Sequence, residues 1–263
     1  MPLYLHELRA LTKTLLLWAG LVALLLLVGT PKFAAYYHDP ELLRLLDAMP
    51  RPLLDALNMR AFNLTTVAGF LGVMHLYFVL FGALVGALLG HEGVAREEAD
   101  RTADFTLTLP VSRRRLLAAK LGAALTHLTL FVTLMAGQTW AATRPFAPPP
   151  AADRFLALQM AATFLVGLTF LAGGFFWGSV LGPPRSGTLN LTLLFGLYFL
   201  ALLRGLHAKL DFLGYLTPFQ WFPAPDLYRQ GHLPLWAVAA AGGLFLVLVG
   251  AAFWAYERRD IGR

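Results

Sequence analysis

The sequence predicts an all-α fold: a polytopic membrane protein with six transmembrane helices, both termini in the cytoplasm and short helices at the membrane interface. The first observation behind this prediction is composition. Hydrophobic residues make up 58% of the 263 positions and charged residues only 14%, whereas soluble domains carry about 25% charged residues. A chain this apolar has more hydrophobic surface than one soluble core can bury, so it belongs to the membrane class.

The second observation is the number of long apolar stretches. A membrane-spanning helix needs roughly 20 apolar residues, and six stretches qualify: about 11–30, 64–90, 116–143, 155–182, 189–203 and 235–256. We expect the first to be a retained span rather than a cleaved signal, because Glu7 precedes it and no clear cleavage site follows. The fourth and fifth are separated by a helix-breaking turn at Pro183–Gly187. Residues 1–263 are therefore interpreted as a single transmembrane domain.

The third observation is the distribution of basic residues, which sets the orientation. An even number of spans places both termini on one side, and the basic residues of that side are dense: Arg9, Lys13, Arg96, Arg101, Arg113, Arg114, Arg115, Lys120, Arg185, Arg258, Arg259 and Arg263. The other basic residues are spread over longer loops, so the dense set is expected in the cytoplasm. The net charge of +6 is then explained by loops held against anionic lipid rather than by nucleic-acid binding.

The loops on the opposite side favour interfacial helices. Asp39-Pro40-Glu41 has the N-cap, the first-position proline and the first-turn acid that begin a helix. The leucines that follow form an apolar face, which is typical of a helix lying on the membrane surface. A proline-rich linker at Ala147–Pro150 and an aromatic-rich segment at Leu206–Leu233 complete this side.

The longest cytoplasmic segment, about 91–115, contains a break and a helix start. Pro110 ends any helix before it, and Ser112 is a predicted N-cap flanked by Val111 and Leu116 as a hydrophobic staple. Arg113, Arg114 and Arg115 then fall in a first helical turn, where the helix dipole disfavours cations. Lipid phosphates are the simplest compensation. The residues alone leave two interpretations open: a short helix that receives force from a partner, or a solvated loop that carries orienting charge.

Glycines recur at every fourth position in two spans. Gly82, Gly86 and Gly90 lie on the second span, and Gly174, Gly178 and Gly182 lie on the fourth. Small residues at this spacing let two helix backbones approach closely. Packing within the chain is the simpler explanation, and contact with a second copy is the alternative.

Several motifs resemble those of ABC-2 type transporter permeases. Glu97 leads into Thr102-Ala103-Asp104-Phe105-Thr106-Leu107-Thr108-Leu109-Pro110-Val111-Ser112-Arg113 and then Lys120, which is similar to the family's pattern between spans two and three. Tyr215-Leu216-Thr217-Pro218-Phe219 resembles a family element before the last span. Tyr256-Glu257-Arg258-Arg259-Asp260-Ile261 resembles the family's C-terminal ending. The resemblance covers essentially the whole chain, with Arg101 standing where the family often has glycine.

The resemblance implies a half-transporter in a bacterial or archaeal inner membrane, and we expect it to transport outward. Two copies, or one copy and a paralogue, would form the membrane path over two separate ABC ATPase subunits. The 95–110 segment would carry a coupling helix, with the ATPase contact at Glu97, Glu98, Arg101, Thr102, Asp104, Phe105, Leu109, Pro110 and Arg113. Residues 183–186 would form a second, smaller contact. ATP and Mg²⁺ are expected on the partner, since the chain lacks the G-x-x-x-x-G-K-[ST] loop; we expect this chain to bind no cofactor.

Polar residues inside the spans are the remaining candidates. His75, His127, Gln138, Gln159 and Asn190 could line a transport pathway, although such residues commonly hydrogen-bond a neighbouring helix instead. No catalytic residue and no metal site is predicted, because the histidines and acids lack ligand spacing. Two other functions stay open: an accessory ABC-2 permease that serves metalloenzyme maturation, and a membrane-embedded lipid-modifying enzyme.

Overall fold

Six long helices make up most of the protein. The computed structural model describes residues 2–39, 41, 62–99, 112–204 and 210–259. The long helices within these ranges are α1 (Pro2–Tyr36), α4 (Val67–Ala99), α6 (Arg113–Thr143), α7 (Pro150–Val180), α8 (Arg185–Arg204) and α11 (Leu235–Arg258). Each is long and apolar enough to cross a membrane, and no strand occurs in the described ranges. The predicted all-α fold with six spans is confirmed.

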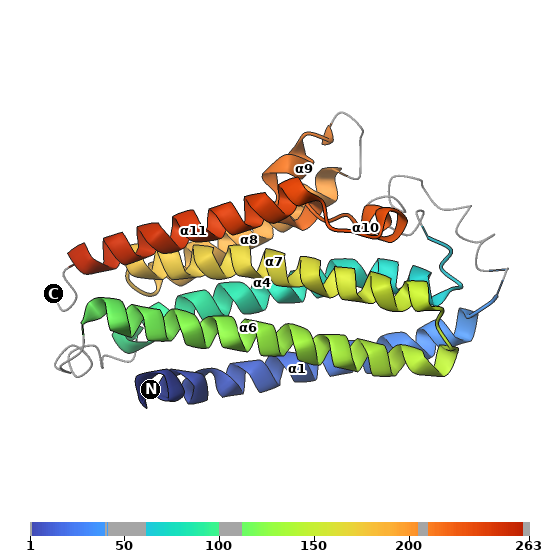
Figure 1. Ribbon diagram of the computed structural model, residues 1–263, viewed down its shortest axis with the longest axis horizontal. Coiled ribbons are helices and arrows are strands. Elements are labelled where there is room, and N and C mark those ends of the chain that lie inside the picture. The colour runs from blue at the N-terminus through green and yellow to red at the C-terminus, as the bar shows by residue number, and fades with distance from the viewer. Residues whose placement is uncertain (1, 40, 42–61, 100–111, 205–209, 260–263) are drawn as a thin grey trace.

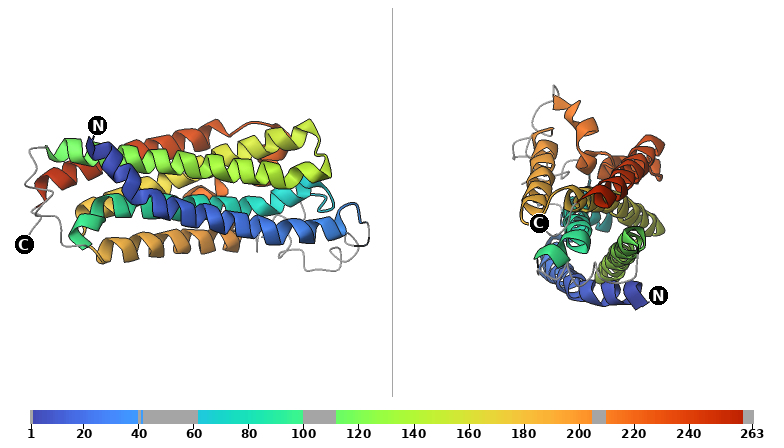
Figure 2. Two further views of the ribbon diagram at one scale, coloured as in Figure 1. Left: turned by 90° about the horizontal axis from the view of Figure 1, so that it is seen from below. Right: turned by 90° about the vertical axis from the view of Figure 1, so that its left-hand side faces the viewer.

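The long helices run side by side along one axis, so the bundle has two distinct ends (Figure 1). One end holds the start of α1, the end of α4, the start of α6, the α7–α8 connection and the end of α11 (Figures 1 and 2). We name it the cytoplasmic end, after the orientation that the basic residues predict. The opposite, outer end holds η1 (Arg144–Phe146), α9 (Leu213–Leu216), η3 (Pro218–Gln220) and α10 (Ala224–Gln230).

The helices are longer than the apolar stretches that predicted them. The first helix begins at Pro2 and passes through Pro31, which lacks the N–H for one helical hydrogen bond, before ending at Tyr36. The second continues past Gly90 to Ala99. The α7–α8 connection is shorter than the predicted turn, because α8 already begins at Arg185. Hydropathy marks the part of a helix that lies in lipid, whereas the helix itself continues while its backbone and charges find partners.

The outer loop after α1 begins as predicted. Asp39 Oδ1 accepts a hydrogen bond from the backbone N–H of Glu41 at 2.8 Å, which is the bond of a helix N-cap. The interfacial helices expected after Glu41 lie outside the described residues. Below the loop, the fully buried ring of Phe33 stacks on Phe70 and meets Phe146 edge-on, each with centroids 4.9 Å apart. These rings join α1, α4 and η1 at the outer end.

The predicted glycine contact joins α4 to α7. A Cβ atom on Gly86 would lie 2.1 Å from the carbonyl oxygen of Gly167, and one on Gly90 equally close to that of Leu171. On α7, a Cβ atom on Gly174 would lie 2.4 Å from the carbonyl oxygen of Ala87. The two backbones therefore touch directly, and the glycine spacing serves packing within the chain.

We expect Gly86→Val to destabilise the protein, because the new side chain overlaps the α7 backbone. Overpacking of this kind costs about 1–3 kcal/mol, and more where backbone must move. The measurement is the thermal unfolding midpoint in detergent. Gly137→Val is the matched control, since Gly137 lies within α6 and a Cβ atom there would meet nothing within 4 Å. Equal midpoints for the two variants would show that the close contact is not a constraint.

Candidate functional site at the cytoplasmic end

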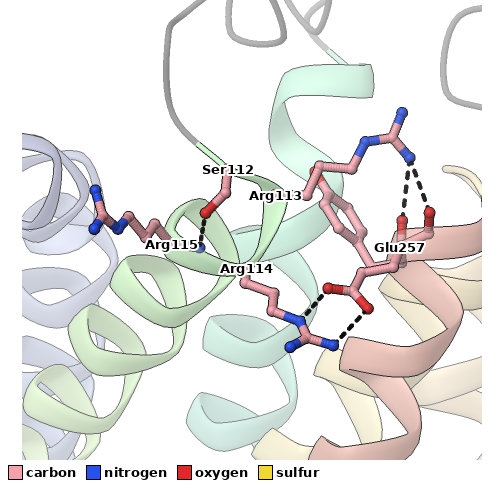
Figure 3. A network of polar contacts seen from close by, with 6 residues as sticks. Ser112, Arg113, Arg114, Arg115 and Glu257 are labelled. Atoms are coloured by element: carbon pink, nitrogen blue, oxygen red, sulfur yellow. Dashed lines mark hydrogen bonds and ion pairs between the residues drawn. The ribbon is translucent and has the colours of Figure 1, made fainter.

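A capped helix start forms one side of the candidate site. Ser112 has extended backbone angles, φ −66° and ψ 145°, and its Oγ accepts from the backbone N–H of Arg115 at 3.4 Å (Figure 3). This confirms Ser112 as the N-cap of α6. Leu116 is buried as the staple requires, whereas its partner Val111 lies outside the described residues.

Two of the three arginines after the cap bind the end of α11. The guanidinium of Arg113 donates to the backbone oxygens of Arg259 at 2.8 Å and Tyr256 at 3.4 Å. Arg114 makes a two-pronged ion pair with Glu257 (Figure 3). Terminal carbonyl groups carry the partial negative charge of a helix C-terminus, so the end of α11 offsets the cations at the start of α6. The lipid interpretation missed this protein partner of Arg114; the side chain of Arg115 points away from α11 (Figure 3).

A buried lysine joins three helices nearby. Lys120, on α6, has a side chain only 1% exposed, and its Nζ lies 2.9 Å from Glu97 Oε1 of α4 and 3.5 Å from Glu7 Oε1 of α1. Burying an ammonium group without an opposite charge is costly. The two carboxylates make this burial tolerable and fix α1, α4 and α6 relative to one another. Removing one partner of such a buried pair leaves an uncompensated charge.

The neighbouring acid of α4 is bound by the opposite side of the bundle. Glu98 Oε2 accepts from Arg259 Nη2 at 2.7 Å, and both side chains are largely buried. The other terminal nitrogen of Arg259 donates to the carbonyl oxygen of Gly178 in α7 at 3.2 Å. The last turn of α4 is therefore attached through Glu97 to α1 and α6, and through Glu98 to α7 and the residue that follows α11.

The structure locates part of the predicted ATPase contact. Glu97, Glu98 and Arg113 all belong to this charged network, and residues 91–99 of the predicted coupling segment are the last turns of α4. The other predicted contact residues lie outside the described residues: Arg101, Thr102, Asp104, Phe105, Leu109 and Pro110. Sequence reasoning assigned Lys120 and Glu7 no common role. In the sequence, Glu7 and Lys120 are charged residues next to or within long apolar stretches. Such a charge requires an opposite charge nearby, but the sequence does not indicate which residue provides it.

The predicted pathway candidates hydrogen-bond backbone groups, four of them across to another element. His75 Nε2 lies 2.9 Å from the carbonyl oxygen of Phe222, Gln159 donates to that of Leu71 at 2.8 Å, and Asn190 donates to that of Ala87 at 3.0 Å. Gln138 reaches Ala19 in α1, and His127 bonds Ala123 within its own helix. These bonds give each residue a part in packing; whether any of them also meets a transported molecule stays a prediction.

Six helices that are long and apolar enough to cross a membrane define a multi-pass membrane protein. The chain matches the family described as ABC-2 family transporter protein over residues 1–261, and it belongs to that family. It is accordingly the membrane component of an ABC transporter, a permease rather than an enzyme, and permeases of this family work with ABC ATPase subunits. No match was found among curated proteins.

We expect Lys120→Met to destabilise the protein by about 3 kcal/mol, because it removes the buried cation that lies between the carboxylates of Glu7 and Glu97. The measurement is thermal unfolding in detergent. Lys13→Met is the matched control, since Lys13 is exposed on α1. Adding Glu97→Gln to Lys120→Met should recover part of the loss. If Lys120→Met and Lys13→Met unfold alike, the buried lysine does not hold these helices together.

Proposed function

We propose that the chain is the permease half of an ATP-driven ABC-2 exporter, moved by separate ATPase subunits that dock on residues 95–110. The observation that carries this proposal is the attachment of the last turn of α4. The segment that would receive the ATPase starts there, and this turn is tied by ion pairs to α1 and α6 on one side and to Arg259 on the other.

The ATPase subunits supply the chemistry in this proposal. They bind ATP and Mg²⁺, and their closure on ATP displaces the docked segment. The carboxylates of Glu97 and Glu98 then pass the displacement to different parts of the bundle. Glu97 is held by Lys120 of α6, and Glu98 is held by Arg259, which follows α11. Stiff ion pairs suit this task better than apolar contacts, since they resist sliding and have a defined geometry.

Docking itself is assigned by family resemblance. Thr102, Asp104, Phe105 and Leu109 would meet the groove of the ATPase. The short connection between α7 and α8 would provide the second contact. It reaches the same end of the bundle (Figure 1), and Pro184 and Arg185 are exposed there.

The exposed face of α8 suits contact with a second copy of the chain. Thr188, Thr192, Phe195, Phe199 and Leu203 follow one another at helical spacing on this face, and all are exposed. A face that mixes threonine with large apolar residues suits helix–helix contact in a membrane, because hydroxyl groups and small side chains are favoured there. We therefore place the homodimer contact, or the contact with a paralogue, on α8.

The proposed location is the inner membrane of a bacterial or archaeal cell, with transport outward. Comparison of medium and cell extracts tests the direction: a compound retained only when the ATPase is inactive supports export, and a compound depleted from the medium only by the active pair contradicts it. Service to metalloenzyme maturation is the second candidate within the family. Nothing in the described residues favours it over export.

We expect Phe105→Asp to abolish capture of the ATPase, because a charge would replace the apolar side chain offered to the docking groove. The test is co-expression with the ATPase of a neighbouring gene, followed by purification in mild detergent and assay of bound ATPase. Leu216→Asp is the matched control, since Leu216 is 60% exposed at the outer end. Undiminished capture by Phe105→Asp would remove the coupling role from this segment.

A cysteine introduced at Thr192 should form a disulfide-linked dimer on mild oxidation, because the proposed contact brings the two copies of α8 together. The chain has no cysteine of its own, so any crosslink reports the new residue. Leu246→Cys is the control, since Leu246 is 70% exposed on α11, away from the proposed face. The readout is electrophoresis without reductant. Efficient crosslinking at Leu246 and none at Thr192 would move the contact to α11.

A further inference from the structure

A cavity opens at the outer end of the bundle, away from the charged network. It has a volume of about 680 Å³ and lies between the end of α8 and the elements α9, η3, α10 and α11. Small-molecule sites commonly have volumes of about 300–1,000 Å³, with apolar walls and a few converging polar groups. Neither the coupling mechanism nor the proposed dimer contact uses this cavity.

Aromatic rings form one wall of the cavity. The ring of Trp236 lies 5.7 Å from that of Tyr215 and 6.4 Å from that of Trp221, measured between centroids, and is inclined to them by 53° and 69°. The indole of Trp221 is buried, and its Nε1 donates to the carbonyl oxygen of Tyr215 at 3.0 Å. The rings therefore stand at angles to one another. The ring of Trp221 is held in place by its burial and its hydrogen bond.

Charged side chains also line the cavity, and Arg204, the cation among the described lining residues, already has partners. The guanidinium of Arg204 lies 3.4 Å from Asp211 Oδ1, donates to Gln220 Oε1 at 2.9 Å and packs on the α-carbon side of Gly214. A second carboxylate, Asp226, also lines the cavity and pairs through Oδ1 with Arg229, which is not among the lining residues. Each aspartate of the described lining is thus paired with an arginine, Asp211 with Arg204 and Asp226 with Arg229.

We propose that this cavity binds a small organic cation of the quaternary ammonium type. The faces of tryptophan and tyrosine rings attract such cations, and an angled set of rings can surround a group that has no hydrogen-bond donor. The carboxylates of Asp211 and Asp226 line the same cavity and would attract the cation, each from beside the arginine with which it is paired. An anion is disfavoured, since Arg204, the one arginine among the described lining residues, is held by Asp211 and Gln220.

Anchoring of the helix ends in the membrane interface is the simpler role for exposed aromatic residues. That role requires rings that face outward among the lipid headgroups. It does not require the buried indole of Trp221 or two carboxylates on the same cavity. An interfacial anchor without a ligand is one of the outcomes of the test below.

The test is titration calorimetry of the purified chain in an uncharged detergent, with tetraethylammonium as the probe and benzenesulfonate as the anionic comparison. No ATPase is present, so failure of ATPase docking cannot affect the result, and absence of binding would leave the permease assignment untouched. We expect saturable binding of tetraethylammonium and none of benzenesulfonate. Trp236→Ala and Asp226→Asn should each weaken binding about tenfold.

Two variants serve as matched controls. Trp254→Ala removes an exposed tryptophan whose ring stacks under the guanidinium of Arg258 at the cytoplasmic end. Asp153→Asn removes the charge of an aspartate that pairs with Arg144. Both variants should bind the probe normally. Trp236→Phe should retain most of the affinity, which separates loss of the ring from loss of the fold. The proposal is overturned if tetraethylammonium does not saturate, if benzenesulfonate binds equally, or if the controls weaken binding as much as the cavity variants.

Discussion

The direct contact between the backbones of α4 and α7 is the constraint on which the rest of the bundle depends. Because Gly86 and Gly167 leave no room for side chains, carbonyl oxygens of α4 come within reach of neighbouring helices. Gln159 and Asn190 use this access, donating to α4 from α7 and α8. α1 and α6 then pack on one side of the pair (Figure 2). In a membrane, where apolar burial does not drive helices together, such close packing and hydrogen bonds are what hold them.

The charged network follows from the same arrangement. α4 stays helical beyond its apolar stretch, so Glu97 and Glu98 project about 100° apart from one turn. One carboxylate meets Lys120 and the other meets Arg259. The start of α6 and the end of α11 complete the network by pairing a cationic helix start with the carbonyl groups of a helix end. Charges that look misplaced in each helix alone are therefore complementary once the helices are assembled.

The sequence predicted what depends on local pattern. Hydropathy gave the six helices, the serine before three arginines gave the start of α6, and glycine spacing gave a close contact. It could not give the partners of charged side chains, since Glu7 and Lys120 are distant in the chain and meet only through the packing of α1 on α6. The length of α4 was underestimated because its apolar stretch ends at Gly90, whereas the helix continues to Ala99 with ion pairs at Glu97 and Glu98. The candidate site was thus recognised by its segment, while its geometry required the fold.

The length of α4 has a mechanical consequence. Its 33 residues form a rod of about 50 Å, and Gly86 contacts α7 near the middle of that rod. α7 also contacts this rod at Leu71 and at Gly90, so a displacement of Ala99 would be carried along α4 by a helix that is supported over most of its length. The outer half is bonded through His75 to the carbonyl oxygen of Phe222, the neighbour of Trp221. The same helix thus connects the ion pairs at one end of the bundle to the aromatic wall of the cavity at the other.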